Sequence, residues 1–222
     1  MADSQELAEL YRIRFEREFL PRKRQIWRVL CRAFFQQFID AEATVIDIAC
    51  GYGEFINQVH AKSRIAVDLN PDTRSHLDAD VEFHALSAGD VAKVGAARAD
   101  VVFTSNFLEH LPDKAALDHF LDQVLTVLKP GGRYLILGPN LRYLPGAYWD
   151  FYDHHLGLTH LALTEALELK GFVVEQCIDR FLPYTTQGAL PTHPLLVQLY
   201  LRLPVFWRLL GKQFFIVASK PR

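Results

Sequence analysis

The chain has 222 residues, of which 50% are hydrophobic and 23% are charged, and its formal net charge is −2. This balance predicts one globular domain with a full core and gives no reason to expect a nucleic-acid partner. Its three cysteines are far apart, which argues against a disulfide framework or a cysteine zinc site and favours a cytoplasmic location. The acidic N-terminus is unlike a signal peptide, and no apolar run reaches the roughly 20 residues that cross a bilayer.

A basic amphipathic helix is predicted to begin near Pro21. Its apolar residues follow helical spacing and predict one buried stripe, made of Ile26, Val29, Leu30, Ala33, Phe34 and Phe38. Five basic residues share this stretch: Arg22, Lys23, Arg24, Arg28 and Arg32. We expect residues 1–40 to form a helical cap over a ligand pocket, with contact to an anionic membrane as the alternative.

From residue 44 onward, short apolar runs alternate with helical patterns. This alternation predicts a mostly parallel sheet with helices on both faces, in a domain spanning residues 41–222. Strands are expected near 44–48, 64–68, 81–85, 100–105, 132–138, 172–178 and 213–219. Helices are expected near 53–62, 113–128 and 162–170.

The first strand runs into a glycine turn, residues 45–55. Gly51 and Gly53 let the backbone pass close to a ligand, where a Cβ would press into that ligand. Asp68 ends the second strand 17 residues after Gly51, about the spacing at which an acid meets ribose hydroxyls in doubly wound nucleotide-binding folds. Strand, glycine turn, helix, strand and acid together predict a nucleoside-binding half-domain.

These motifs resemble those of class I S-adenosylmethionine-dependent methyltransferases. Residues 47–53 resemble the first motif of that family, with Ala49 in place of its first glycine. Further matches follow in the family's order at residues 66–71, 89–90, 99–111 and 128–137, the last beginning Leu-Lys-Pro-Gly-Gly. The resemblance spans roughly residues 40–220.

The resemblance implies a Rossmann-like, doubly wound α/β fold, with a seven-stranded, mostly parallel sheet whose last strand is antiparallel. It implies S-adenosyl-L-methionine as the cofactor. The residues placed to bind it are Asp47, Ala49, Cys50, Gly51, Gly53, Asp68, Leu69, Asn70, Gly89, Asp90, Ser105 and Asn106.

Transfer of a methyl group to a hydroxyl needs a base, and histidine titrates near working pH. The segment 149–160 follows the fifth strand, on the rim where such sheets bind ligands, and mixes aromatic rings, carboxylates and histidines. We expect acceptor contacts from Trp149, Tyr152 and Asp153. Four histidines are candidate catalytic residues, with His154 or His155 favoured, His110 in reserve, and His160 as the fourth.

Three other chemistries fit less well. Asp150, Asp153 and the nearby histidines offer ligands for a divalent ion, and Asn106-x-x-Glu109-His110 resembles the acid-x-x-Glu-His pattern of some ubiquinone-pathway O-methyltransferases. Asn in place of the acid weakens that likeness, so no metal is expected. A nicotinamide dehydrogenase would need a third spaced glycine where Ile56 stands. A polyamine synthase would need an acid-rich amine pocket.

The region between the last two expected strands, about 179–212, is too long for a hairpin and is strongly apolar. Packing in the core, a substrate lid, a homodimer contact and a membrane-facing patch are all open. The expected function is O-methylation of a small-molecule or glycan acceptor, lipid-linked acceptors included, by a cytoplasmic or membrane-peripheral enzyme. The alternative is a non-catalytic interaction subunit with the same fold.

Overall fold

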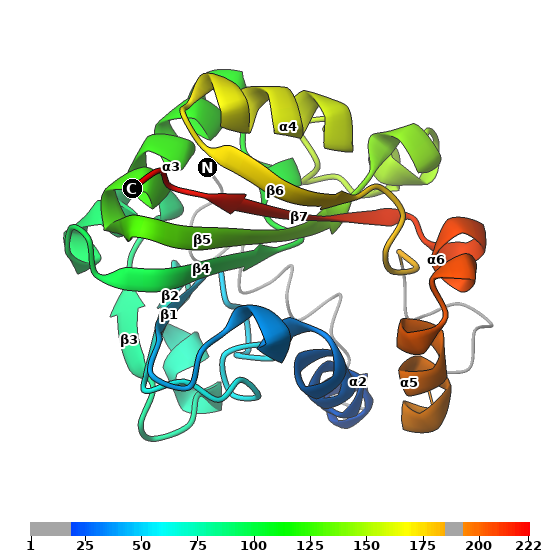
Figure 1. The fold of residues 1–222 in the computed structure, drawn as a ribbon, viewed down its shortest axis with the longest axis horizontal. Coiled ribbons are helices and arrows are strands. Elements are labelled where there is room, and N and C mark those ends of the chain that lie inside the picture. Colours follow the sequence, from blue (N-terminus) through cyan, green and yellow to red (C-terminus); the bar gives the residue numbers. More distant parts are fainter. Residues whose placement is uncertain (1–18, 185–192) are drawn as a thin grey trace.

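The computed structural model describes residues 19–184 and 193–222 and contains a seven-stranded sheet with helices on both faces (Figure 1). The sheet order is β3-β2-β1-β4-β5-β7-β6. The pairs that exclude β7 are parallel, and β7 is antiparallel to both of its neighbours. The strands are β1 Thr44–Ile48, β2 Ser63–Asp68, β3 Glu82–Ala85, β4 Ala99–Ser105, β5 Leu128–Pro139, β6 Val173–Ile178 and β7 Gln213–Ser219. The Rossmann-like, doubly wound fold predicted from the sequence is confirmed.

The helices in the described ranges are α2 Phe19–Ala33, α3 Lys114–Val127, α4 His160–Leu169, α5 Pro194–Arg202 and α6 Pro204–Leu210. Short 3₁₀ turns join them: η1 Phe35–Phe38, η2 Pro71–His76, η3 Ala88–Val94, η4 Leu108–His110, η5 Leu141–Tyr143 and η6 Ala147–Asp150. Side-chain caps fix the starts of α3 and α4, where Asp113 and Thr159 accept backbone N–H bonds. Across these ranges, no helix is long and apolar enough to cross a membrane.

The helix predicted for residues 53–62 is wrong, because residues 51–59 form a series of turns. Gly51 and Gly53 have φ angles of 56° and 72°, in the left-handed region that a right-handed helix excludes. The side chain of Asn57 then bonds outside the segment, donating to the carbonyl of His76 and accepting from the N–H of Asp78. These bonds hold the segment against the loop after β2.

Two buried clusters cover the two faces of the sheet. One packs α3 and α4 against one face, and the other packs α2 and residues 50–59 against the opposite face. The stripe predicted for α2 is only partly correct, since Ala33 is exposed and Trp27, Cys31 and Phe35 are buried instead. The helix α2 shares one buried cluster with the sheet. The division into a cap (1–40) and a main domain (41–222) stays a proposal. Residues 1–18 of the cap lie outside the described ranges.

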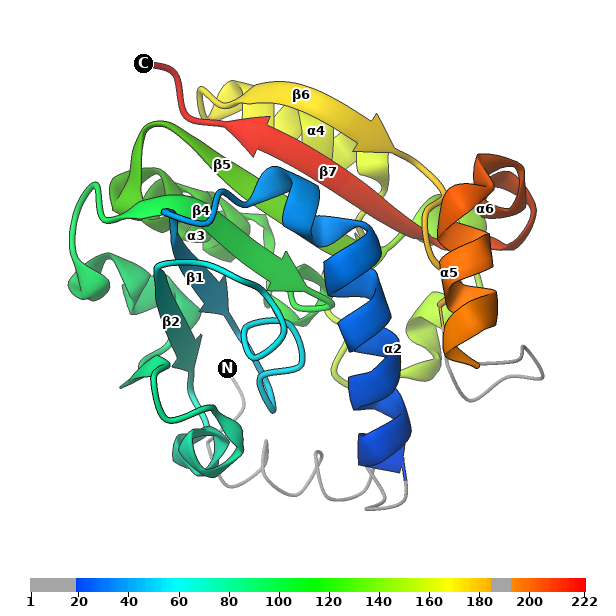
Figure 2. The same ribbon diagram turned by 60° about the horizontal axis from the view of Figure 1, so that its bottom comes forward.

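The strand order places a topological switch between β1 and β4. The chain leaves β1 for β2 on one side, and β4 lies on the other, so the carboxyl ends of these two strands border the crevice where such sheets bind ligands. Figure 2 shows α2 lying beside the arrowhead of β4, with α5 next to it. The region predicted as an apolar insertion therefore forms α5 and α6 at this edge, and its residues 185–192 lie outside the described ranges.

Candidate functional site

The turn after β1 has an unusual backbone. Ala49, Gly51 and Gly53 all have positive φ angles, of 55°, 56° and 72°. For a residue with a Cβ, this conformation costs roughly 1–2 kcal/mol, so a glycine at position 49 would be the unstrained choice. A non-glycine residue held in this region is a strain that the surrounding structure must compensate.

Asp68, at the end of β2, holds this turn in place. Its Oδ2 accepts the N–H of Gly51 at 2.9 Å, and its Oδ1 accepts the N–H of Asn70 at 2.9 Å. Burial raises the pKa of the Asp68 carboxyl, while these backbone hydrogen bonds oppose that rise. The predicted glycine turn and the predicted second-strand acid are therefore joined directly.

Three buried carboxyl groups lie around the turn. Asp47, Glu54 and Asp68 are 2%, 8% and 6% exposed. Burial raises the pKa of Asp47, and the negative charges of Glu54 and Asp68 raise it further, against the lowering effect of a hydrogen bond from the Ile56 backbone. Lys23 of α2 reaches Glu54 at 2.8 Å. A cationic ligand in this crevice would relieve the remaining repulsion between the carboxylates.

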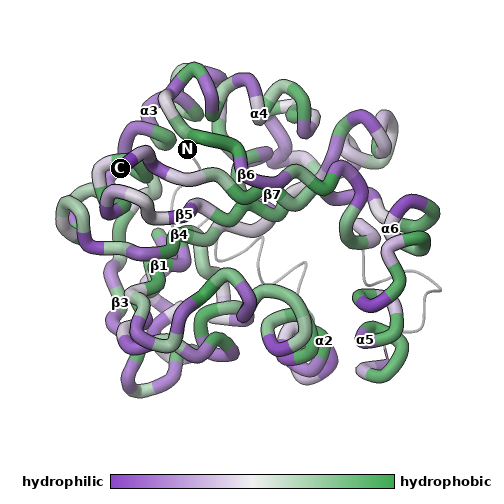
Figure 3. Tube along the Cα trace, in the orientation of Figure 1, coloured by the Kyte–Doolittle hydropathy of each residue, from purple (hydrophilic) through white to green (hydrophobic). Residues whose placement is uncertain are grey.

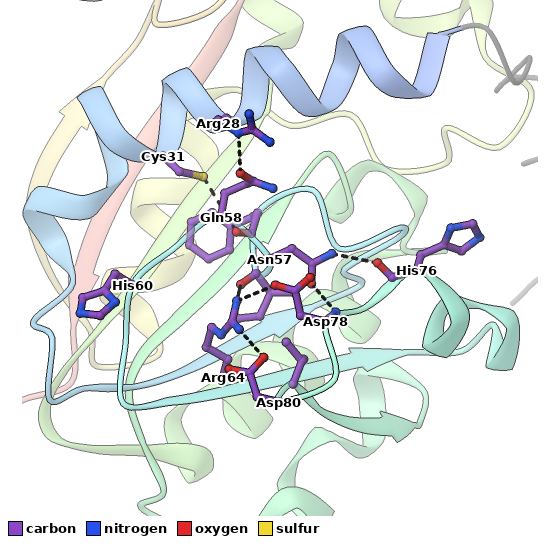
Figure 4. Close-up of polar contacts among 12 residues, drawn as sticks. Arg28, Cys31, Asn57, Gln58, His60, Arg64, His76, Asp78 and Asp80 are labelled. Atoms are coloured by element: carbon purple, nitrogen blue, oxygen red, sulfur yellow. Dashed lines mark hydrogen bonds and ion pairs between the residues drawn. The ribbon is translucent and has the colours of Figure 1, made fainter.

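The helix α2 is fastened to the segment that follows the glycine turn. Figure 4 shows Arg28 and Cys31 pointing from α2 toward this segment. The Nε of Arg28 donates to Gln58 at 3.3 Å, and the Sγ of Cys31 lies 3.9 Å from the carbonyl of Phe55. The helix thus packs on the segment after the turn, and its role as a cap over a ligand pocket stays a prediction.

The other predicted cofactor residues follow β2, β3 and β4. Asn70 caps η2, and its neighbour Leu69 donates a backbone hydrogen bond to Asp68. Gly89 and Asp90 lie in η3, where Asp90 pairs with Lys93 at 2.8 Å on a half-exposed surface. Residues Cys50, Ser105 and Asn106 lie at the ends of β1 and β4, with Cys50 buried and Asn106 exposed at a φ of 49°.

His110 forms the centre of the histidine cluster. Its Nδ1 lies 3.0 Å from the carbonyl of Asp153 and 3.1 Å from the Oδ2 of the same residue. Both of these atoms only accept, so Nδ1 carries the proton, and in the neutral ring Nε2 keeps its lone pair. Burial lowers the pKa of His110, but the Asp153 hydrogen bond and the charges of Glu109 and Asp153 outweigh this effect and raise it above its ordinary value.

Glu109 and His154 complete this cluster. Glu109 is 3% exposed, and burial raises its pKa. The ring centroids of His154 and His110 are 5.1 Å apart, and the ring of His154 stacks on that of Phe151. Ligand atoms of Glu109, His110 and His154 all lie within 4.8 Å of one another, which is a spacing that a divalent ion could bridge.

His160 lies in a different environment. The Nδ2 of Asn140 is 2.9 Å from the Nδ1 of His160 and donates to the carbonyl of Asp179, while the Oδ1 of Asn140 accepts from the N–H of Arg142. These two backbone partners fix the amide orientation, so Nδ1 of His160 accepts and its Nε2 carries the proton. Burial lowers the pKa of His160. The negative charge of Asp179 raises this pKa and the positive charge of Arg142 lowers it, and the net shift is downward.

The structure therefore brings together His110, Asp153 and His154, but not His155 or His160. The side chain of His155 is exposed, Trp149 is half-exposed, and Tyr152 is 95% exposed. Among the other residues of the cluster, Glu109 was considered only for a metal site, Phe151 only as part of segment 149–160, and Tyr148 was not predicted. The hydroxyl of the buried Tyr148 donates to the carbonyl of Leu156 and its ring packs on His154. The aromatic composition of this segment was a signal for these two rings, whereas nothing in the sequence pointed to burial of Glu109.

Comparisons with known proteins identify the family of the chain and support its fold. A family model for the methyltransferase domain matches residues 19–177. A probable S-adenosylmethionine-dependent methyltransferase of Mycolicibacterium smegmatis is 32% identical over 143 residues, which cover 62% of this chain and 54% of that protein. A ubiquinone biosynthesis O-methyltransferase of Hydrogenovibrio crunogenus is 34% identical over 110 residues, covering 45% and 44%. The chain thus spans about half the length of the curated relatives it matches.

Among solved structures, an S-adenosylmethionine-dependent methyltransferase from Archaeoglobus fulgidus superposes with a TM-score of 0.64. The match covers 89% of this chain and 94% of the other at 20% identity, so it bears on the fold alone.

Proposed function

The chain belongs to the class I S-adenosylmethionine-dependent methyltransferases, and from that membership we propose that it methylates a hydroxyl oxygen of a small-molecule or glycan acceptor. The observation that carries the proposal is the pair formed by His110, in the turn after β4, and Asp153, in the segment after β5. A histidine held by a carboxylate through Nδ1 is set up to accept a proton at Nε2, which is what methylation of a hydroxyl requires.

We propose that the cofactor is held by the turn after β1 and by the ends of β2, β3 and β4. S-adenosylmethionine supplies a methyl group that is already activated by its sulfonium centre. The buried carboxyl groups of Asp47 and Asp68 suit a ligand with positive charge, and Gly51 and Gly53 hold the turn in its left-handed conformation. Asp90 is proposed to face the adenine amino group. Its carboxylate would then leave its ion pair with Lys93 and accept a hydrogen bond from the ligand.

His110 is the proposed base among the four candidate histidines. Its Nε2 lone pair takes the proton of the acceptor hydroxyl, and the charges of Asp153 and Glu109 stabilise the imidazolium that forms. A general base of this kind contributes about 10²–10⁴ in rate. His154 is 8% exposed, and the neutral ring of His160 carries its proton on Nε2, so neither is as well placed.

This assignment changes the roles expected from the sequence. Asp153 becomes the residue that positions the base, and it is no longer an acceptor contact. Trp149 and Tyr152 keep their proposed role on the acceptor side of the crevice, where their exposure leaves them free to contact a ligand. The favoured base moves from the pair at 154 and 155 to His110.

A second candidate is a metal-assisted O-methyltransferase. The spacing of Glu109, His110 and His154 favours it, and one relative is named as a ubiquinone biosynthesis O-methyltransferase. In that case a divalent ion would lower the pKa of the acceptor hydroxyl, and His110 would serve as a ligand instead of a base.

The test has two stages. Calorimetry with S-adenosylmethionine and its demethylated product comes first, and absence of binding would overturn the proposal. A methyl-transfer assay with labelled donor on fractionated cell extract then identifies an acceptor, and analysis of the product distinguishes O- from N-methylation. A chain that binds the cofactor and labels no fraction would favour the non-catalytic subunit.

The base assignment is tested with His110→Gln and, as a matched control, His155→Gln. We expect His110→Gln to lose about 10²–10⁴ in turnover with unchanged cofactor affinity. The control should retain near-normal turnover, because the ring of His155 is exposed. Near-normal turnover in His110→Gln would eliminate it as the base.

A further inference from the structure

The helices α5 and α6 present an extended apolar surface to solvent. Eight large apolar side chains on or between them are exposed: Leu195, Leu196, Leu199, Leu203, Val205, Phe206, Leu209 and Leu210. Their exposed fractions run from 38% to 68%. We call this set the α5–α6 apolar face. A surface of this kind on a globular domain marks a place where something binds.

This face is not the packed side of the helices. The inner side of α5 carries Val197, Tyr200 and Leu201, which pack into the buried cluster that holds α2 against the sheet. At 100° per residue, Leu195 and Leu199 lie on the opposite side, and Leu203 follows directly after the helix. The helix is therefore apolar on its outer as well as its inner side, with Gln198 and Arg202 as its polar residues. An outer apolar side is typical of a helix that is covered by protein or by lipid. Figure 3 shows the hydrophobic colour over much of α5 and α6.

Basic residues are concentrated on α5 and α6 and on the neighbouring helix α2. Residues 19–39 and 193–212, which include α2, α5 and α6, hold eight of the chain's 24 Lys and Arg residues and none of its 26 Asp and Glu residues. The chain as a whole is slightly negative, so this is a local concentration of positive charge. The helices α2 and α5 pack against each other, and the Arg residues at 22, 24, 28, 32, 202 and 208 are all exposed.

We propose that the α5–α6 apolar face, with the basic residues beside it, docks the protein on an anionic lipid membrane. Apolar side chains at such a surface enter the headgroup boundary, and each Lys or Arg near anionic lipid adds attraction. A second copy of the chain fits this surface less well. A two-fold contact sets the same patch against itself, which would bring both sets of arginines together without acidic partners.

The docking surface adjoins the crevice. Lys23 of α2 pairs with Glu54 in the glycine turn, and Arg180 donates to the carbonyl of Arg208 in α6 while lying 3.8 Å above the Tyr143 ring of η5. Docking would thus bring the crevice to a lipid-borne acceptor. That consequence rests on the proposed function, whereas the docking itself does not.

The experiment is flotation of the full chain with extruded vesicles. One set is phosphatidylcholine alone, and the other contains about 30% phosphatidylglycerol, an anionic surface of the kind that attracts basic segments. We expect tight partition into the anionic vesicles that weakens as salt is added. Failure of the wild-type chain to float with anionic vesicles would overturn the proposal.

Two paired variants separate the apolar and charged contributions. Leu199→Ser with Leu209→Ser should lower partition about tenfold or more, since two exposed leucines no longer bury their area. Arg24→Glu with Arg32→Glu should lower it by more than about 30-fold on anionic vesicles, because each lost attraction accounts for about fivefold and each new carboxylate adds repulsion. The matched controls are Leu169→Ser with Val173→Ser, at exposed sites away from α5 and α6, and Lys62→Glu with Lys114→Glu.

Equal losses in the controls and the test variants would contradict the proposed surface. Sedimentation velocity without lipid tests whether a second copy of the chain binds the face instead. If the wild-type chain is a dimer that does not bind vesicles, and Leu199→Ser with Leu209→Ser dissociates this dimer, the face is a self-association surface. Cofactor affinity is measured on every variant and should stay unchanged. A chain that binds the cofactor but does not float with vesicles would contradict the docking surface and not the proposed function. A chain that floats but does not bind the cofactor would contradict the proposed function and not the docking surface.

Discussion

Gly53→Ala is the substitution whose effect the structure determines most directly. A Cβ on Gly53 would lie 2.6 Å from Cδ2 of Leu77 and 2.7 Å from Nδ2 of Asn57. The sequence suggested that this Cβ would meet the ligand, but in the structure it meets protein atoms first. Leu77 can move, whereas Asn57 is held by its bonds to His76 and Asp78.

The magnitude has two parts. The φ of 72° costs an alanine roughly 1–2 kcal/mol. Overpacking against fixed neighbours costs about 1–3 kcal/mol. We therefore expect the free energy of unfolding to fall by about 2–5 kcal/mol, and cofactor affinity to fall with it, because the turn is displaced.

The assay is urea unfolding, with Gly89→Ala as the control. A Cβ on Gly89 would be no closer than 3.6 Å to its neighbours, so this variant should stay within about 0.5 kcal/mol of wild type. The effect of Gly53→Ala on the free energy of unfolding should be smaller in a Leu77→Ala background than in the wild-type chain. The shorter side chain relieves part of the packing cost, whereas the backbone cost remains. If Gly53→Ala and Gly89→Ala were equally stable, the reasoning would be refuted.

Three further predictions concern the site. Asp68→Ala should weaken S-adenosylmethionine binding in calorimetry, at about 1.5–3 kcal/mol for each charge-assisted hydrogen bond lost; a folded variant with wild-type affinity would remove Asp68 from the pocket. Turnover should fall as pH drops through the raised pKa of His110, because the imidazolium cannot accept a proton, and Asp153→Asn should move that limb to lower pH. An unshifted profile would show that Asp153 does not act through His110. Dialysis against a chelator should leave turnover unchanged, and a loss restored by Mg²⁺ would favour the metal-assisted mechanism.

The strands and the glycine turn were readable from the sequence because their determinants are local. The central strands contain runs of apolar, often β-branched residues, and such a run indicates a strand buried in a sheet. The edge strands Glu82–Ala85 and Val173–Ile178 are mostly exposed or half-buried. Thr44–Ile48 and Gln213–Ser219 match their predicted ranges, and the remaining strands differ by a few residues at their ends. The link between the turn and Asp68 was also predictable, since adjacent parallel strands place their carboxyl ends together.

The helix expected at 53–62 failed for a reason that lies outside the local pattern. Apolar spacing favoured a helix, but the left-handed glycines and the bonds of Asn57 to the loop after β2 hold the segment in turns. In α2, spacing located the buried side to within about one residue. The exact set, with Trp27 and Phe35 buried and Ala33 exposed, depends on how the helix rotates against the sheet.

The choice among the histidines was decided only by tertiary structure. The sequence set His154 and His155 beside Asp153, but alternate positions in an irregular segment point in different directions, and spacing does not determine which ring reaches which carboxylate. His110 comes from the turn after β4, 43 residues earlier, and meets Asp153 because the backbone after Asp153 is bonded to the carbonyl of Glu109. Sequence specifies residue types and local conformation, whereas the partner of a side chain, and with it the pKa and the tautomer, depends on contacts between segments that only folding brings together.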